Sequence, residues 1–396
     1  MKKTISLFLA MLFISIAAVP IYAENAQKTE AEYWDVYVPS TDAELDLGVK
    51  SAILVEAKTG KVLYEHNAHE PLAPASVTKT MTLLLVAEAV ASGQISPSDE
   101  VIISEYAASM GGSQVFLKEG EAMSVEELIK CTVIASANDA AVALAEHISG
   151  NERSFVSAMN EKAKALGLKG SVFENTTGLD DDVTEHTMCA SDIATISREL
   201  LKHGIITKYS SVWQDSIRNG EFTLTNTNRL VRYYEGCTGL KTGSTDKAGF
   251  CVSASAKKGN TELIAVIMGA ETGSARNEAA RGLLDFGFSN YALYKCAPHD
   301  AGLIKTMGAK VKDAPITAPD TFFAVVNKAD LNKVSVSYEL PDKICAPLSS
   351  GTCVGRVIYK VGDKIIGSSA VILKEDIEKI SFINVFFNTL LSSFTE

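Results

Sequence analysis

The spacing of apolar residues changes twice along this chain. Strand-like apolar runs at residues 51–57 and 61–64 flank the turn sequence Lys58-Thr59-Gly60, a pattern typical of a β-hairpin. Ser124 and Glu127 then match a capping box at the start of a helical pattern. Apolar residues at helical spacing predict helices over residues 75–91, 124–134, 139–148, 151–166 and 191–203.

Strand patterns return after residue 221. Three short apolar runs, with Gly259-Asn260 as a turn between the last two, predict an antiparallel meander over residues 236–241, 248–256 and 261–270. A helix over residues 275–286 is expected to pack on these strands. Because strands lie at both ends and helices lie between them, residues 45–290 are predicted to form an α+β domain whose antiparallel sheet is closed by distant segments.

A second domain is predicted after residue 290. Residues 291–374 contain alternating apolar and polar runs separated by Gly, Pro, Asp and Ser, which is typical of a small all-β domain. The length of 396 residues and the apolar content of 46% also indicate two domains or more.

The N-terminal segments are expected to lie outside both domains. Residues 1–23 place Lys2 and Lys3 before an apolar run that ends in Ile21-Tyr22-Ala23. This pattern predicts a secretory signal peptide that is cleaved after Ala23, and an uncleaved anchor is the alternative. Residues 24–44 are polar and acidic and are predicted to form an N-terminal arm or linker.

The C-terminal segment, residues 375–396, is predicted to be an amphipathic helix that lies in a membrane surface. Its large apolar residues gather on one side of a helical wheel: Ile380, Ile383, Phe386, Phe387, Leu390, Leu391 and Phe394. The segment is too short and too often interrupted by polar residues to span a bilayer. The alternative is a helix packed on the β domain, which Glu375, Asp376 and Glu378 favour because anionic lipid repels them.

Charge and composition exclude several kinds of partner. Without Lys2 and Lys3, the chain has 48 acidic and 35 basic residues, a net charge of about −13, which argues against a nucleic-acid partner. Six scattered histidines show no metal-ligand spacing, so no metal or cofactor is expected. Seven cysteines leave disulfide pairing open, with Cys237/Cys251 and Cys345/Cys353 nearest in sequence.

The candidate chemistry begins at the start of the first long helix, in Pro74-Ala-Ser-Val-Thr-Lys79. Ser76 and Lys79 are three residues apart and share one helix face. A lysine that burial keeps neutral can take the proton of a serine hydroxyl. Backbone N–H groups at a helix start have no helical partner and can stabilise an oxyanion.

Two further motifs supply the other groups that acyl transfer needs. Ser136-Ala137-Asn138 falls at a break between helical patterns, where the hydroxyl can relay a proton and the amide can hold a carbonyl. Lys241-Thr242-Gly243 ends the first strand of the meander. There the lysine and the hydroxyl can bind a carboxylate, and the glycine allows a substrate strand to approach.

Each motif has a second match, and Ser76 alone is also compatible with a helix cap. The Lys-Thr-Gly match in the hairpin turn precedes the nucleophile, and the second Ser-x-Asn match has the pattern of a helix stop followed by a cap. These two are therefore interpreted as structural. The alternative matches are Ser244/Lys247, Ser255/Lys258, Ser149/Asn151 and Lys58-Thr59-Gly60.

Three longer strings resemble low-molecular-weight penicillin-binding proteins, the D-alanyl-D-alanine carboxypeptidases. They are Pro74-Ala-Ser-Val-Thr-Lys79, Ser136-Ala-Asn-Asp-Ala140 and Gly239-Leu-Lys-Thr-Gly-Ser-Thr-Asp-Lys-Ala-Gly-Phe250. The resemblance implies a β-lactamase/transpeptidase-like catalytic domain followed by the small β domain and a membrane-binding C terminus. It also implies an exported enzyme at the outer face of the cytoplasmic membrane that removes the terminal D-alanine from peptidoglycan stem pentapeptides and is acylated by β-lactams.

The resemblance also implies a role for each motif residue. Ser76 is the acylated nucleophile and Lys79 its base, while Ser136 relays protons and Asn138 holds the substrate. The carboxylate clamp and the strand beside it are Lys241, Thr242, Gly243 and Ser244, and the backbone N–H groups of Ser76 and Ser244 form the oxyanion hole.

Three other functions compete with this reading. A β-lactamase would share the motifs, but no convincing Glu-x-x-x-Asn segment follows Ser136. A hydrolase with a nucleophile elbow would need a Gly-x-Ser-x-Gly sequence, which does not occur. A catalytically silent penicillin-binding or sensor protein would have lost a chemical residue, and none is lost here.

Overall fold

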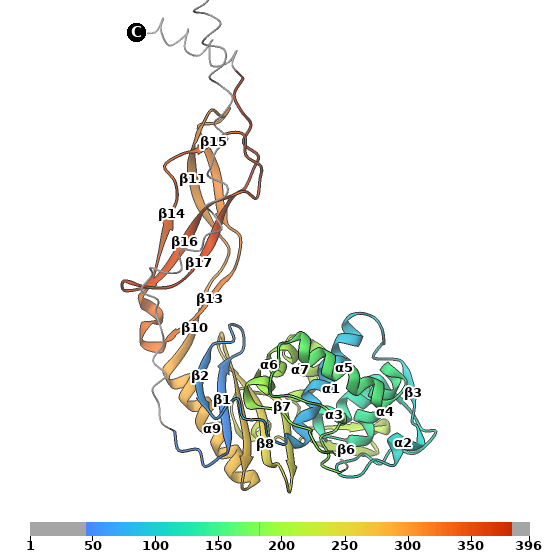
Figure 1. Cartoon of the computed structure of the whole chain (residues 1–396). Coiled ribbons are helices and arrows are strands. Elements are labelled where there is room, and N and C mark those ends of the chain that lie inside the picture. The colour runs from blue at the N-terminus through green and yellow to red at the C-terminus, as the bar shows by residue number, and fades with distance from the viewer. Residues whose placement is uncertain (1–44, 182, 382–396) are drawn as a thin grey trace, which may run out of the picture.

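The computed structural model describes residues 45–181 and 183–381. Figure 1 shows a body of helices and sheet, residues 45–290, from which an elongated β domain, residues 291–381, extends away. The end of the β domain where the described chain stops lies farthest from the body. Residues 1–44 and 382–396, which include the predicted signal peptide, the arm and most of the predicted membrane helix, lie outside the described residues.

The elements of the body are β1 (Ser51–Glu56), β2 (Val62–His66), η2 (Ala75–Thr78), α1 (Lys79–Ala91), β3 (Glu100–Ile102), α2 (Glu105–Ala108), β4 (Ala122–Ser124), α3 (Val125–Ile134), α4 (Asn138–Ser149), α5 (Glu152–Ala165), α6 (Ala190–Leu200), α7 (Gly204–Ser210), β5 (Gln214–Ile217), η3 (Arg218–Gly220), β6 (Phe222–Thr225), α8 (Leu230–Tyr233), β7 (Cys237–Thr245), β8 (Gly249–Lys258), β9 (Thr261–Ala270) and α9 (Gly273–Asn290). Those of the β domain are β10 (Tyr291–Cys296), β11 (His299–Met307), β12 (Asp313–Ala318), β13 (Phe322–Asn327), η4 (Lys328–Lys333), β14 (Val334–Glu339), β15 (Ile344–Cys345), β16 (Cys353–Val361) and β17 (Lys364–Leu373).

The body is organised around a five-stranded antiparallel sheet with the order β2-β1-β9-β8-β7. β1 pairs with β9 in a register that places Ser51 opposite Met268, although these residues lie near opposite ends of the body in sequence. The predicted hairpin and meander are present, and distant segments close the sheet as expected. The chain therefore has the predicted α+β fold.

Alternate residues of the sheet face two different helical layers. Ile53 and Val266 pack in the cluster that includes α1 and α6, whereas Leu54 and Ala265 pack in the cluster that includes α9. This alternation follows from the two-residue period of a strand. The helices between β2 and β5 form the side of the body that Figure 1 shows at the right, away from the edge where β2 lies.

Two local predictions need correction. The helix predicted to begin at residue 75 starts with the 3₁₀ turn η2, and α1 begins only at Lys79. The strand predicted to end at Lys241 continues to Thr245. Gly243 therefore lies inside the edge strand β7, and a glycine within a strand often marks a place where another backbone approaches closely.

The β domain is built on a six-stranded sheet with the order β14-β16-β17-β12-β11-β15. The first strand of the domain, β10, follows α9 directly and forms a separate two-stranded sheet with β13. Tyr291 and Leu293 of β10 are buried in the same cluster as Leu284 of α9. The start of the β domain is therefore packed on the body through apolar contacts.

The end of the described chain is extended, so the helix predicted to start at residue 375 is wrong for residues 375–381. Ile377 forms a bridge with Leu348 and Lys379 forms one with Ala309. Ile377 is 2% exposed within the core of the β domain. A helical wheel uses only the local spacing of residues. It therefore misses the burial of Ile377, whose partner Leu348 lies far away in sequence.

The described residues contain neither a helix suited to cross a membrane nor a disulfide bond. Among residues 45–181 and 183–381, no helix combines the length and the apolar character needed to cross a membrane. All seven cysteines lie in this part of the chain and carry free thiols.

Replacing Ile377 with Ala should destabilise the β domain, because it leaves a cavity where the chain end is buried. The expected loss in the free energy of unfolding is about 2–5 kcal/mol. Thermal unfolding followed by circular dichroism measures it. Leu303→Ala is the matched control, since Leu303 is 68% exposed in the same domain and should change stability by less than about 0.5 kcal/mol. Equal midpoints for the two variants would contradict the packed position of residues 375–381.

Candidate active site

Ser76 and Lys79 meet because they stand one turn of a 3₁₀ helix apart. Ser76 lies in η2 and Lys79 is the first residue of α1. Three residues per turn bring positions i and i+3 onto the same side, and Lys79 Nζ lies 2.9 Å from Ser76 Oγ in a hydrogen bond. The N-cap residues of η2 and α1 are Pro74 and Thr78. Ser76 is therefore not a helix cap.

The Lys79 amine is fully enclosed. Lys79 is 0% exposed, and its Nζ donates to Asn138 Oδ1 at 2.5 Å and to the Thr177 carbonyl oxygen at 2.8 Å. Burial holds the pKa of Lys79 well below its ordinary range, and the charge of Lys241 lowers that pKa further while Asp139 opposes the shift. A neutral amine beside the Ser76 hydroxyl is equipped to act as a base.

Ser136 and Asn138 sit at the junction between α3 and α4. Ser136 is 3% exposed and has a φ of 61°, a left-handed conformation that only firm packing maintains in a residue with a side chain. Asn138 Nδ2 donates to the Gly111 carbonyl oxygen at 2.7 Å. This bond fixes the orientation of the amide, so that Asn138 Oδ1 faces Lys79.

Lys241 links the edge strand β7 to the α3–α4 junction. Its Nζ donates to Ser136 Oγ at 2.7 Å and to the Thr242 carbonyl oxygen at 2.8 Å. Burial, together with the charge of Arg276, lowers the pKa of Lys241 to about 7. A carboxylate bound nearby would raise that pKa again, because an opposite charge favours the ammonium form.

The strand beyond Lys241 lies against the nucleophile turn, which is the 3₁₀ turn η2 that carries the candidate nucleophile Ser76. A Cβ atom placed on Gly243 would come within 2.6 Å of the Ser76 amide nitrogen and 2.8 Å of the Val77 amide nitrogen. Only glycine therefore allows this approach. Thr242 Oγ1 donates to Thr227 Oγ1 at 2.7 Å, and Ser244 is exposed on the same strand.

The structure thus brings together the three motifs that the sequence singled out. Ser76, Lys79 and Asn138 form one bonded group, and Lys241 joins Ser136 to β7. Gly243 places the strand beside Ser76.

Apart from Ser244/Lys247, which lies on the site strand β7 and the turn after it, the second matches of these motifs lie in structural positions. Lys58 is exposed in the β1–β2 turn over the Phe323 ring. Asn151 caps α5 by accepting from the Ser154 N–H. Ser255 Oγ is hydrogen-bonded to Thr238 Oγ1, and Lys258 lies over the Tyr234 ring. The structural interpretation of Lys58-Thr59-Gly60 and of Ser149/Asn151 agrees with this geometry.

Sequence motifs did not reveal several residues around the site. Asp139 is buried and its carboxylate accepts the N–H groups of Val115 and Leu117. His186 Nδ1 accepts from the Glu174 N–H, so its Nε2–H donates to Thr78 Oγ1 beside the nucleophile turn. Burial lowers the pKa of His186 to about 4, which keeps this ring neutral. A backbone carbonyl such as that of Thr177 has no sequence signature, although Asn175-x-x-Gly178 is a recognisable turn signal.

Within the described ranges, no three His, Cys, Asp or Glu side chains are grouped so that they could hold a metal ion.

Comparison with known proteins decides the family. A family model described as D-alanyl-D-alanine carboxypeptidase matches residues 38–272, more than half of the chain. The chain belongs to the D-alanyl-D-alanine carboxypeptidase family. A second model, described as the C-terminal domain of penicillin-binding protein 5, matches residues 295–379. The resemblance seen in the sequence motifs is therefore confirmed.

Relatives and solved structures of this carboxypeptidase family agree with the match. The chain is 44% identical to D-alanyl-D-alanine carboxypeptidase DacF of Bacillus subtilis (strain 168), over 88% of this chain and 90% of that protein. The structure is similar to penicillin-binding protein 5 from Haemophilus influenzae, with a TM-score of 0.75 and 30% identity over 85% of this chain and 99% of that one. Penicillin-binding protein D2 from Listeria monocytogenes, solved in an ampicillin-bound form, has a TM-score of 0.57 and 29% identity over 62% of this chain and 99% of that one.

Proposed function

We propose that this member of the carboxypeptidase family is a serine-type D-Ala-D-Ala carboxypeptidase that removes the terminal D-alanine from peptidoglycan stem pentapeptides. The observation that carries the proposal is the buried Lys79 amine in hydrogen bond with Ser76 Oγ. Family membership supplies the substrate class. The chemistry needs no cofactor.

In the first step, Ser76 Oγ attacks the carbonyl carbon of the terminal peptide bond, and the hydroxyl proton passes to the Lys79 lone pair. Lys79 then gives up this proton, which reaches the leaving D-alanine amine through Ser136 as the C–N bond breaks. An ester remains on Ser76. Water then adds to the ester carbonyl, the C–O bond breaks, and Ser76 regains its proton while the shortened peptide leaves as a carboxylic acid.

Substrate would be held along the edge strand β7. We assign the terminal carboxylate to Lys241 and Thr242, since a charge-assisted hydrogen bond from a lysine suits a carboxylate. The close approach at Gly243 places the start of η2 beside this strand. We assign the oxyanion hole to the backbone N–H groups of Ser76 and Ser244 on these two segments, and Asn138 to the substrate peptide.

The same site would be acylated by β-lactam antibiotics, because their strained amide resembles the D-Ala-D-Ala bond. Two alternative functions have less support. A β-lactamase would not explain the second family model, which matches the β domain. A catalytically silent protein would not need a buried base hydrogen-bonded to the nucleophile and a clamp hydrogen-bonded to the proton relay.

We further propose that the protein is exported and associates with the outer face of the cytoplasmic membrane through residues 382–396. The described chain ends beside the β11–β12 turn, where the Ile380 N–H donates to the Gly308 carbonyl oxygen. Met307 and Val311 at this turn are 55% and 50% exposed, and such apolar side chains suit an interface with lipid.

Two acidic residues that would oppose lipid binding already have partners. Glu378 pairs with Lys310, and Asp376 Oδ1 accepts from the Ser350 N–H. Their repulsion from anionic lipid is correspondingly reduced. The apolar residues of the tail then supply the attraction through burial in the headgroup region.

A labelled β-lactam should form a covalent adduct on Ser76, because this hydroxyl alone has a buried lysine amine as its base among the Ser-x-x-Lys matches. Ser76→Ala is expected to abolish the adduct and the release of D-alanine from a D-Ala-D-Ala peptide. Peptide mapping by mass spectrometry locates the label. Ser255→Ala is the control and should keep the adduct. A label that survives in Ser76→Ala and disappears in Ser255→Ala would show that the nucleophile is misassigned.

Removing Lys241 should weaken recognition of a free carboxylate. Lys241→Ala is expected to lower kcat/KM for a free-acid peptide by a factor on the order of 100, since a charge-assisted hydrogen bond of roughly 3 kcal/mol is lost. The matching peptide with a C-terminal amide should lose far less. Lys58→Ala, at the exposed second Lys-Thr-Gly, should have no effect. The same loss for both peptides, or for both variants, would overturn the clamp assignment.

The chain that starts at Glu24 and ends at Ser381 should lose binding to anionic lipid vesicles, because the apolar residues of the tail are removed. Flotation of the protein with vesicles measures this binding against the chain that ends at Glu396. The thermal midpoint should stay unchanged, since the buried Ile377 is retained. If both chains float equally well, or neither does, residues 382–396 are not the membrane contact.

A further inference from the structure

The loop of residues 175–179 touches the catalytic lysine although no motif marks it. Its Thr177 carbonyl oxygen accepts from Lys79 Nζ at 2.8 Å. A neutral amine has two N–H donors and one lone pair. Asn138 Oδ1 and the Thr177 carbonyl oxygen are acceptors that take the two donors, so the lone pair is left to face Ser76 Oγ. If the Thr177 carbonyl moved, the amine would be free to rotate.

The loop is pressed against the nucleophile turn. Gly178 has a φ of 78°, and a Cβ atom there would lie 1.8 Å from the Ala75 carbonyl oxygen. Asn175 Oδ1 accepts the N–H groups of Thr177 and Gly178 at 3.2 and 2.7 Å, and Asn175 Nδ2 donates to the Leu179 carbonyl oxygen at 2.9 Å. These bonds set the conformation of the loop itself.

A carboxylate from another helix ties this loop to the body. Glu152, the first residue of α5, accepts both the N–H and the Oγ1–H of Thr176 on Oε1, at 2.9 and 2.7 Å. On the other side, Thr82 Oγ1 of α1 donates to the Thr176 carbonyl oxygen at 2.7 Å. Thr176 is therefore held by three hydrogen bonds immediately before the residue whose carbonyl binds Lys79.

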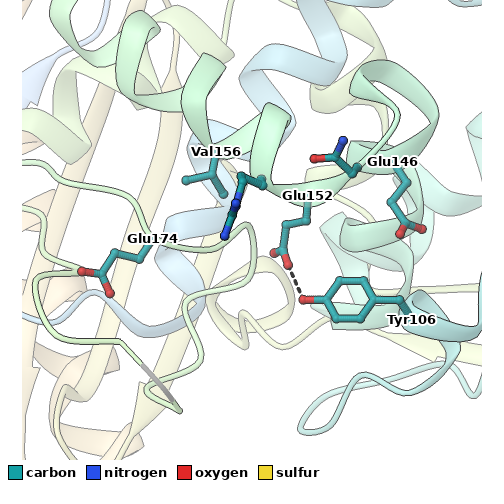
Figure 2. A pocket seen from close by; sticks show the side chains of 7 residues that line it. Tyr106, Glu146, Glu152, Val156 and Glu174 are labelled. Carbon is teal, nitrogen blue, oxygen red and sulfur yellow. Dashed lines mark hydrogen bonds between the residues drawn. The ribbon is translucent and has the colours of Figure 1, made fainter.

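The second oxygen of Glu152 is fixed as well. Tyr106 Oη donates to Glu152 Oε2 at 2.6 Å, as Figure 2 shows. The hydrogen bond to Glu152, with burial and nearby acidic charge, raises the pKa of Tyr106 to about 12, so the donor keeps its proton at neutral pH. Glu152 is thus oriented at both oxygens.

We propose that Glu152 is a positioning residue for acylation, which acts through Thr176 to hold the Thr177 carbonyl against Lys79 and so aims the amine lone pair at Ser76. This inference rests on the proposed function of Ser76 and Lys79. It assigns Glu152 no contact with substrate.

The surrounding pocket supports this role over that of a ligand site. It has a volume of about 350 Å³ and is lined mainly by polar side chains, including Glu146, Glu152 and Glu174 (Figure 2). Glu146 accepts from Ser104 Oγ at 2.6 Å, and Glu174 accepts the N–H groups of Thr184 and Glu185 at 2.8 Å each. All three carboxylates are therefore already engaged by the protein.

Glu152→Ala is expected to lower the first-order rate constant for acylation by a chromogenic β-lactam between about 10-fold and about 100-fold, because a misplaced base costs rate rather than binding. Stopped-flow measurements over a range of β-lactam concentrations separate this constant from the dissociation constant of the initial complex. The dissociation constant should stay within about 3-fold of the unmodified enzyme. Glu152→Gln should restore most of the rate, since its amide oxygen still accepts from Thr176.

Glu146→Ala is the matched control, because it removes a carboxylate from the same pocket without touching the loop. It should acylate at the rate of the unmodified enzyme. Thr176→Val deletes one of the two bonds to Glu152 and is expected to slow acylation about 5-fold. It decides the question if Glu152→Ala does not fold.

Three outcomes would overturn the proposal: an unchanged acylation rate in Glu152→Ala and Thr176→Val, an equal loss in Glu146→Ala, or a loss confined to the initial complex. A failure of the proposed function would give a different experimental result. In that case the unmodified enzyme itself would form no adduct on Ser76.

Discussion

The burial of the Lys79 amine is the constraint on which the rest of the site depends. An ammonium group enclosed beside a second buried lysine is unfavourable, so the pKa of Lys79 falls well below its ordinary range and the neutral amine is favoured. A buried neutral amine still needs partners for its N–H groups. The protein provides them from Asn138 and Thr177, which lie 59 and 98 residues away in sequence. The Lys79 amine therefore has its hydrogen-bond partners only when these distant segments have folded together.

The fold explains how such distant groups meet. Closure of the sheet by β1 and β9 fixes the edge strand β7, and the glycine at 243 lets this edge lie against η2. The helical insertion then brings the α3–α4 junction and the 175–179 loop onto the other sides of Lys79. Lys241 joins the strand to the insertion through Ser136. The candidate site of this chain thus lies between the sheet edge and the inserted helical layer.

The sequence predicted the residues of the candidate chemistry better than the groups that hold those residues in place. Ser76 with Lys79, the Ser136–Asn138 motif and the Lys241–Gly243 motif are short patterns whose residue types suit acyl transfer, so they could be recognised without a structure. The Thr177 carbonyl and the bond from Glu152 to Thr176 could not, because a backbone atom has no residue signature and the contact spans distant segments. The continuation of β7 past Gly243 and the burial of Ile377 were missed for the same reason, since both depend on long-range packing.

Titration of the Lys79 amine shows whether this lysine is a neutral base in the resting enzyme. Selective ¹³Cε labelling of lysine, with the Lys79→Met variant to assign the resonance, allows the pKa of this amine to be followed by NMR. The Lys79 resonance is expected to titrate far below the usual lysine value of about 10.5. If the Lys79 amine remains protonated up to that value, it is an ammonium in the resting enzyme and cannot be the base for Ser76.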